Sequence, residues 1–244
     1  MRAATIATML FLANMSQAAH AVEVPIPKFS SAEVGSALPA GWEKVELPYG
    51  GKSEFHIVAD GKTRALQLRS AGSFGSAAHR LSVETSNAPM VRWRWKIDHA
   101  LQKANLETKA GEDFAARLYV SFDFPAEELP AGERMKLSLA GANGGFVPAA
   151  AICYVWDNSH AVGTSAWSPY FSHVRVIVLQ SGKDRVGQWA EETRDVEADF
   201  LAAFGDKWKG KIPKITGVVA GNDTDQTGES VTAWFGDIHL ESRR

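Results

Sequence analysis

Residues 88–98, APMVRWRWKID, alternate apolar and polar side chains more strictly than any other stretch of the chain. Successive side chains of a β-strand point to opposite faces, so the two tryptophans of this run share one face and its cations share the other. A strand of this kind has one face packed in a core. The cations predicted on its opposite face are Arg92, Arg94 and Lys96.

Further short runs of this type follow along the chain, with turn residues between them. The runs at 54–58 and 63–69 flank Asp60-Gly61, a dipeptide that favours a tight hairpin. We count roughly nine to twelve strand-like runs by this periodicity. The regular alternation of strands and helices that a parallel α/β fold requires is missing. We therefore predict an all-β fold, an antiparallel β-sandwich of the jelly-roll type.

Three segments depart from the strand pattern. Residues 195–204 carry an apolar stripe at helical spacing, with Asp195 as N-cap and Gly205 as the stop, which predicts one short amphipathic helix. Residues 125–148 contain three prolines and a Gly-rich stretch, which predicts a long loop. The small, Gly-rich residues 71–78 are expected to form a shorter loop.

The N-terminus has the three parts of an export signal. Arg2 provides a positive charge, residues 3–13 are mostly apolar, and Ala19-His20-Ala21 has the form of a cleavage site. We expect cleavage after Ala21 and a periplasmic or secreted protein. The apolar run is too short to span a bilayer, and no later run is long and apolar enough for a membrane helix.

Removal of the signal peptide, residues 1–21, leaves an extended N-terminal lead-in at residues 22–41 and a single β-sandwich domain at residues 42–244. The formal net charge of −2 gives no electrostatic basis for binding nucleic acid. Cys153 is the single cysteine and lies in an apolar run, so it is predicted to be a buried thiol that packs as a small hydrophobe.

An acidic turn, residues 222–229 (NDTDQTGE), lies between two apolar runs near the C-terminus. Asp223, Asp225 and Glu229 are hard oxygen donors, and a small loop of this kind could hold a structural Ca²⁺, although the spacing is not that of an EF-hand. No other cofactor is expected. Two other interpretations stay open: a hydrophilic turn whose side chains bond their own backbone, and a ligand-binding turn.

Residues 113–124 place Asp113, Arg117 and Tyr119 on one face of a predicted strand. Asp113 and Arg117 would lie about 13 Å apart on an extended strand, so each is expected to pair with a neighbouring strand. An acid of the terminal turn is a candidate partner for Arg117. If this face is concave, Arg94 could lie beside Arg117 and Tyr119, and guanidinium donors with aromatic rings would form a sugar-binding floor.

Trp156 ends an apolar strand just before the polar residues 157–160, a position that suits either the core or the rim of a site. The candidate ligand-binding residues are thus Arg94, Asp113, Arg117, Tyr119, Trp156, Asp223 and Asp225.

Common catalytic motifs are missing from the sequence. It contains no G-x-S-x-G, no H-E-x-x-H, no phosphate-binding Gly loop and no histidine pair with metal-ligand spacing. A polysaccharide lyase or glycosidase that uses Arg117, Tyr119 and an Asp stays open as an alternative.

Several segments together resemble one family, a domain of unknown function found in exported bacterial proteins. They are GEDFAARLYV at 111–120, YVW at 154–156, the series G-x-W…RDV…DF…FG between 187 and 205, and DTD…FGDI between 223 and 238. The resemblance runs from about residue 40 to the C-terminus. It implies a β-sandwich related to galactose-binding-like and carbohydrate-binding jelly rolls, and it implies no established activity.

We therefore expect an exported, non-catalytic binding protein for a carbohydrate, such as a cell-envelope glycan, or another small polar ligand. Two alternatives are a polysaccharide-acting enzyme and a structural or assembly protein without a small ligand. Neither nucleic acid nor an integral membrane segment is expected after signal cleavage.

Overall fold

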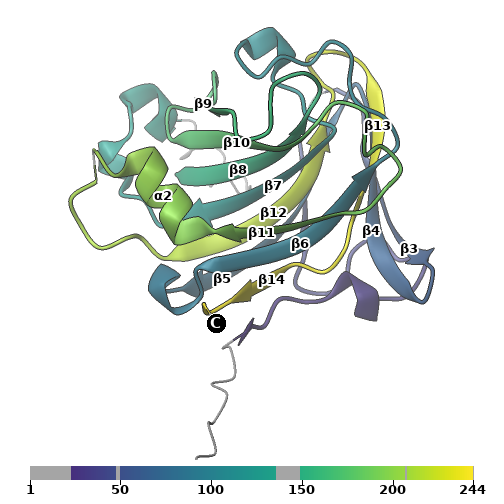
Figure 1. Cartoon of the computed structure of the whole chain (residues 1–244), viewed down its shortest axis with the longest axis horizontal. Helices are drawn as coiled ribbons and strands as arrows, with labels where there is room; N and C mark the ends of the chain where they lie inside the picture. Colours follow the sequence, from purple (N-terminus) through teal and green to yellow (C-terminus); the bar gives the residue numbers. More distant parts are fainter. Residues whose placement is uncertain (1–22, 48–49, 136–148, 207, 244) are drawn as a thin grey trace, which may run out of the picture.

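The strand predicted from the strictest alternation is present as β6 (Met90–Ile97), in which every second side chain is buried. The protein is described by a computed structural model that covers residues 23–47, 50–135, 149–206 and 208–243. Its strands form two seven-stranded sheets. The two sheets pack face to face (Figure 1). The predicted all-β sandwich is thereby confirmed.

Sheet A is built around β6. Its strand order is β1, β14, β6, β13, β4, β3, and β11 pairs with β6 at a position off this path. All of its pairs are antiparallel. Besides β6, the strands are β1 (Glu23–Val24), β14 (His239–Glu241), β13 (Ser230–Phe235), β4 (Thr63–Ala71), β3 (Glu54–Asp60) and β11 (Ala190–Asp195).

Sheet B has the order β2, β5, β12, β7, β8, β10, β9. One pair, β8 with β10, is parallel, so the sandwich is antiparallel in all other pairs of the described residues. The strands are β2 (Glu43–Glu46), β5 (Phe74–Val83), β12 (Ile215–Asp223), β7 (Ala116–Phe122), β8 (Ala150–Asp157), β10 (Val174–Ser181) and β9 (Ser165–Trp167).

The main core lies between the inner faces of the two sheets. Trp93 and Trp95 of sheet A pack there against Tyr154 and Trp156 of sheet B, with ring centroids 5.3 Å apart for Trp93–Tyr154 and 6.3 Å apart for Trp95–Trp156. Burial of such aromatic side chains is a large stabilising term for a domain of this size.

A second apolar cluster covers part of the outer face of sheet B. It joins Leu106 and Phe114 to residues of β8 and β10, including Cys153. Every residue of β8 is therefore buried, since side chains pack on both faces of that strand. The prediction of a buried thiol at Cys153 is confirmed.

The predicted helix is α2 (Val196–Phe204), and Asp195 caps it by accepting a hydrogen bond from the N–H of Ala198 at 3.0 Å. Gly205 follows the helix in a right-handed conformation, so it does not form the left-handed cap that a terminal glycine often provides. The helix lies at one end of the sandwich and contacts β8, β6 and β11 (Figure 1).

Short 3₁₀ turns occupy Phe29–Ser31, Thr85–Asn87, Lys109–Gly111 and Ala126–Glu128, and residues 131–135 are helical. The rest of the predicted loop at 125–148 lies largely outside the described residues, as does the predicted signal peptide. No helix in the described ranges is long and apolar enough to cross a membrane.

The prediction of a loop at residues 71–78 was wrong, because β5 begins at Phe74. The small residues there serve packing. A Cβ on Gly75 would collide with the side chain of Ser53, and Ser76, Ala77 and Ala78 are all buried. Sequence patterns associate small residues with loops, whereas here they let a strand lie between two others.

Candidate functional site

Five of the seven residues predicted as the site come together at one end of sheet B, whereas Arg94 and Trp156 lie elsewhere. Arg117 and Asp223 form an ion pair at the end of sheet B, with Nη1 2.9 Å from Oδ2. The two side chains are 3% and 6% exposed. Strands β7 and β12 are neighbours, which brings these residues together although they are 106 positions apart in the sequence. The predicted pairing of Arg117 with an acid of the terminal turn is confirmed.

Asp113 belongs to the same cluster. Carboxylate oxygens of Asp113, Asp223 and Asp225 lie within 4.8 Å of one another. Asp113 precedes β7 and is fully buried, and it accepts hydrogen bonds from the N–H groups of Gln226 at 3.4 Å and Thr227 at 2.7 Å. Asp113 thus fixes the terminal turn, as Arg117 does from the neighbouring strand. We call Arg117, Asp113, Asp223 and Asp225 the buried cluster.

The third predicted calcium ligand lies elsewhere. The Glu229 carboxylate accepts hydrogen bonds from the N–H groups of Gln102 and Lys103, the shortest at 2.9 Å. In the described part of the chain, the three carboxylates with oxygens close enough to share a cation are those of Asp113, Asp223 and Asp225. Their oxygens are of the type that Ca²⁺ prefers, but Asp113 and Asp223 already accept hydrogen bonds from the protein.

Burial governs the chemistry of the buried cluster. It raises the pKa of Asp223 well above the ordinary value, and the Arg117 guanidinium acts against that rise. It also raises the pKa of Glu112, a neighbouring carboxyl that the sequence did not single out. Burial likewise raises the pKa of Tyr119 and moves that of Cys153 to about 12. Both groups stay protonated at neutral pH.

Part of the Arg117 guanidinium forms no hydrogen bond in the described structure. Its guanidinium carbon lies 4.5 Å from the ring centroid of Phe74 and 5.4 Å from that of Tyr119, while Nε and Nη2 are buried with no hydrogen-bond partner in the described structure. The arrangement is a packed ion-pair network that holds the acidic turn, which crosses from β12 of sheet B to β13 of sheet A. It offers no open surface to a ligand the size of a sugar.

Two predicted site residues lie away from this cluster. Trp156 is 1% exposed, packs in the core and donates its indole N–H to the carbonyl of Gly182 at 3.1 Å, so it forms no part of a rim. Arg94 does not lie beside Arg117 and Tyr119, because β6 and β7 belong to different sheets and these side chains point away from each other. The expectation of a joint floor was wrong, since sheet membership follows from long-range pairing.

Arg94 lies on the outer face of sheet A. On this face, polar and aromatic side chains of neighbouring strands lie beside one another. Trp234 of β13 is opposite Lys96 of β6 on one side and Gln67 of β4 on the other. Ala190 is opposite Trp95, which places Trp189 next to Lys96 on the other flank of β6. We call Trp189, Lys96 and Trp234 the indole row.

The indole row is held by cation–π contacts. The Lys96 ammonium lies 4.9 Å from the ring centroid of each tryptophan, and both indoles are partly exposed. Arg94 stacks on Trp189 at 4.2 Å. Asp60, at the end of β3, accepts hydrogen bonds from the Trp189 indole at 3.2 Å and from Arg94 at 2.9 Å. Trp189 is therefore fixed on the sheet, which lowers the entropy that binding would cost.

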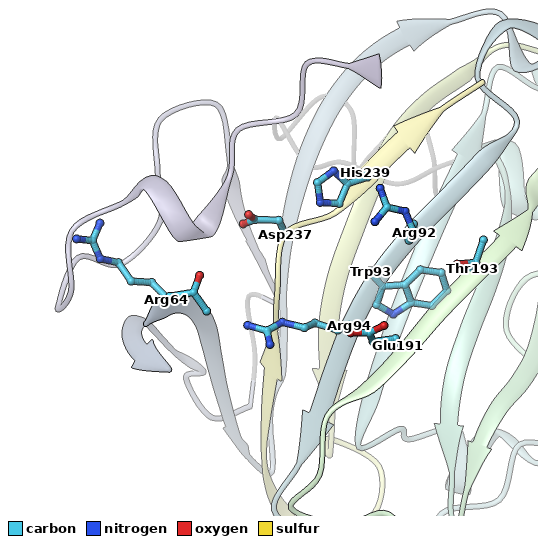
Figure 2. Close-up of a pocket in the computed structure, with 9 residues that line it drawn as sticks. Arg64, Arg92, Trp93, Arg94, Glu191, Thr193, Asp237 and His239 are labelled. Carbon is cyan, nitrogen blue, oxygen red and sulfur yellow. The ribbon is translucent and has the colours of Figure 1, made fainter. Parts of the chain in front are cut away.

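A hollow lies on each side of the indole row. The first hollow has a volume of about 360 Å³, and Figure 2 shows its side chains around an open space between β6, β11, β14 and the start of β4. The second hollow has a volume of about 270 Å³ and lies toward the far end of β6. The first is lined by Thr63, Arg64, Arg92, Trp93, Arg94, Glu191, Thr193, Asp237 and His239, the second by Glu54, Gln67, Arg69, Asp98, Ser230, Val231, Thr232 and Trp234.

Sequence reasoning did not assign the indole row to a site. The period-2 pattern of residues 230–235 carries a usable signal, since Trp234 alternates with the buried Ala233 and Phe235 and must point outward. No local pattern indicates that Trp189 lies beside Lys96, because that contact depends on the pairing of β11 with β6.

The chain is a two-sheet β-sandwich protein with one open, partly aromatic sheet face. It belongs to the family described as Protein of unknown function (DUF3047), which matches residues 40–239. The family resemblance predicted from the sequence motifs is confirmed. Among curated proteins, no match is found.

Solved structures with a similar fold include carbohydrate-binding modules and glycanases. The xyloglucanase domain of NopAA from Sinorhizobium fredii, in complex with cellobiose, is 10% identical with a TM-score of 0.49, covering 87% of this chain and 97% of that one. The family 11 carbohydrate-binding module of Lic26A-Cel5E from Clostridium thermocellum is 9% identical with a TM-score of 0.41, covering 86% and 95%. Endoglucanase cel12A from Rhodothermus marinus is 8% identical with a TM-score of 0.44, covering 84% and 93%. At such low identity, ligands and activities are not transferred from these proteins.

Proposed function

We propose that the protein is an exported, non-catalytic glycan-binding protein whose binding surface is the outer face of sheet A. The observation that carries this proposal is the indole row, in which two partly exposed tryptophans flank Lys96 on one open sheet face. Indole rings offer flat apolar area to the C–H faces of a sugar, and amide, guanidinium and carboxylate groups beside them offer both donors and acceptors to hydroxyls.

The two sheets differ in how far their outer faces are available. On sheet B, Leu106 and Phe114 cover β8 and β10, and the Arg117–Asp223 pair is buried. On sheet A, most outward side chains of β6, β4 and β13 are polar or aromatic and at least partly exposed, among them Arg92, Arg94, Lys96, Gln67, Arg69, Thr232 and Trp234. The face of sheet A is therefore the better surface for a polar ligand.

A catalytic role at Arg117 and Tyr119 is less well supported. A lyase that used Tyr119 as its base would need a lowered pKa, but burial raises the pKa of this phenol. Arg117 is occupied by Asp223 and covered by Phe74.

Binding is tested by affinity electrophoresis in gels that contain one soluble polysaccharide each: mixed-linkage β-glucan, xyloglucan, galactan and alginate. Wild-type protein is expected to be retarded by at least one of them. Trp189→Ala and Trp234→Ala should each weaken that binding by about 2 kcal/mol, roughly 30-fold, as for truncation of a central aromatic contact.

The matched control is Trp208→Ala, which removes a partly exposed tryptophan that packs on Phe124 and Phe200 and lines neither hollow. It should keep the wild-type mobility shift, and circular dichroism checks that all three variants are folded. Absence of retardation in every gel would overturn the proposal and favour a structural or assembly role. Retardation that survives both sheet A variants would place the site elsewhere.

Export is part of the proposal and rests on the character of residues 1–21. N-terminal sequencing of the protein recovered from the periplasm or medium should begin at Val22. Recovery of the full-length chain in the cytoplasm alone would contradict this.

A further inference from the structure

We infer that the ligand is an extended, neutral polysaccharide that lies along the strands of sheet A and occupies both hollows at once. This inference rests on the proposed function and names the length and charge of the glycan. Its starting point is that the two hollows lie on one face of the sheet with the indole row between them.

We call the strip of sheet A that runs from the first hollow across the indole row to the second hollow the track, and residues of β6 and Asp98 just after it lie along its whole length. Arg92 and Arg94 line the first hollow, Lys96 belongs to the indole row, and Asp98, just after β6, lines the second hollow. All four point to the same side because they alternate with buried residues. From Arg92 to Asp98 the chain rises about 20 Å at the usual spacing of a strand. A single sugar ring is much shorter than this track.

The indole row connects the hollows. Arg94, which stacks on Trp189, lines the first hollow, and Trp234 lines the second. A glycan chain that crosses the row would contact the exposed parts of the indoles in its middle and place hydroxyls in a polar hollow at each end. A monosaccharide could use one hollow or one ring, and it would leave the other groups without a contact.

The charges on this face favour a neutral chain. Arg92 pairs with Glu241 at 3.3 Å and Arg94 pairs with Asp60 at 2.9 Å, so these guanidiniums already have counter-charges. Across the second hollow, Glu54 is opposite Arg69 in the register of β3 and β4. Such a surface offers hydrogen-bonding groups of both kinds without a net field that would select an anionic polymer.

The test is isothermal titration calorimetry of the full-length mature protein with size-fractionated partial hydrolysates of mixed-linkage β-glucan, xyloglucan and galactan, and with alginate oligomers. For a neutral polymer that binds, Kd should fall roughly tenfold to a hundredfold between the disaccharide and the fragment that reaches both hollows, because the second contact becomes intramolecular. Beyond that length Kd should stay constant.

Two variants locate the ends of the track. Glu191→Ala in the first hollow and Gln67→Ala in the second should each remove most of the gain from chain length. Glu107→Ala, an exposed acid outside both hollows, is the matched control and should leave the length dependence unchanged. Both hollow variants change surface side chains, so a thermal melt should show them folded.

The outcomes separate this inference from the proposed function. If no fragment or polymer binds, the proposed function fails. If glycans bind with a Kd independent of length, or if only one of the two hollow variants reduces the gain from length, the protein is a glycan binder with a short site and the inference is overturned. Tighter binding of alginate oligomers than of neutral oligomers would overturn the neutral character.

Discussion

Replacement of Arg117 by Met removes the counter-charge of a buried carboxylate. Asp223 is 4% exposed and has Asp113 and Asp225 as its closest acidic neighbours, so the variant would leave uncompensated negative charge inside the protein. Loss of one partner of a buried ion pair typically costs about 3–5 kcal/mol. For a chain of this size, about 1 kcal/mol lowers Tm by about 2–4 °C, so we expect Tm to fall by roughly 10 °C.

A double-mutant cycle separates the pair from the packing of the Arg117 stem against Phe74. Asp223→Asn alone should also destabilise, because it leaves the guanidinium without its carboxylate. The double variant should lose about 2–3 kcal/mol less than the sum of the single losses, since neither partner is left charged and alone. Urea denaturation followed by tryptophan fluorescence gives the three values, and a common m-value shows that the denatured states are comparable.

The loss should also depend on pH. Burial raises the pKa of Asp223, so a proton neutralises this group more readily in the folded state than in the unfolded state. The cost of Arg117→Met should therefore be smaller at pH 5 than at pH 8. Arg175→Met, at a partly exposed arginine that bonds Ser165, is the control and should cost less than about 1 kcal/mol at both pH values. Additive single losses, or a cost that does not change with pH, would show that Arg117 acts through packing alone.

Two further predictions concern titration and metal binding. The Glu192 carboxylate accepts hydrogen bonds from the Trp95 indole and from Gln180, and burial raises its pKa. The protonated form is therefore favoured in the folded state, so the stability of the protein should fall as pH rises from about 4.3 through the folded-state pKa of Glu192. Glu192→Gln should flatten the stability–pH curve in that range, and an unchanged slope in urea denaturation would contradict this. The calcium hypothesis predicts that millimolar Ca²⁺ raises Tm and that Asp225→Asn abolishes the rise. If Ca²⁺ does not shift the Tm of the wild-type protein, the hypothesis of a calcium ion in the buried cluster is rejected.

Much of the fold is predictable because it follows from local periodicity. The alternation at residues 88–98 identifies β6 and assigns Trp93 and Trp95 to the core, and the hairpin signal at Asp60-Gly61 identifies the turn between β3 and β4. The N-cap at Asp195 marks the start of α2. Each of these patterns involves only a few residues that are close in the sequence, so it can be recognised without knowing which strands pair.

The sequence-based predictions of the site and of one loop were wrong where the surroundings of a residue depend on contacts between distant parts of the chain. Trp156 follows the same pattern whether it faces a core or a rim, and the packing of Trp95 on it decides for the core. Gly75 belongs to a loop by composition, yet its lack of a side chain makes room for Ser53 beside a strand. Arg94 and Arg117 are both outward cations, and the sheet to which each strand belongs places them on opposite sides.

The acidic turn at 222–229 shows most clearly which features the sequence determines and which depend on the tertiary structure. Its composition alone determined that a hydrophilic turn would join two strands and that its acids could meet Arg117. The tertiary structure decided that Asp223 meets Arg117 while Glu229 binds the amides of Gln102 and Lys103. It also placed Trp189 beside Lys96 and Trp234 on the open face of sheet A. Periodicity determines which way a side chain points, but its neighbours across a sheet are set by strand order and register, which are properties of the whole chain.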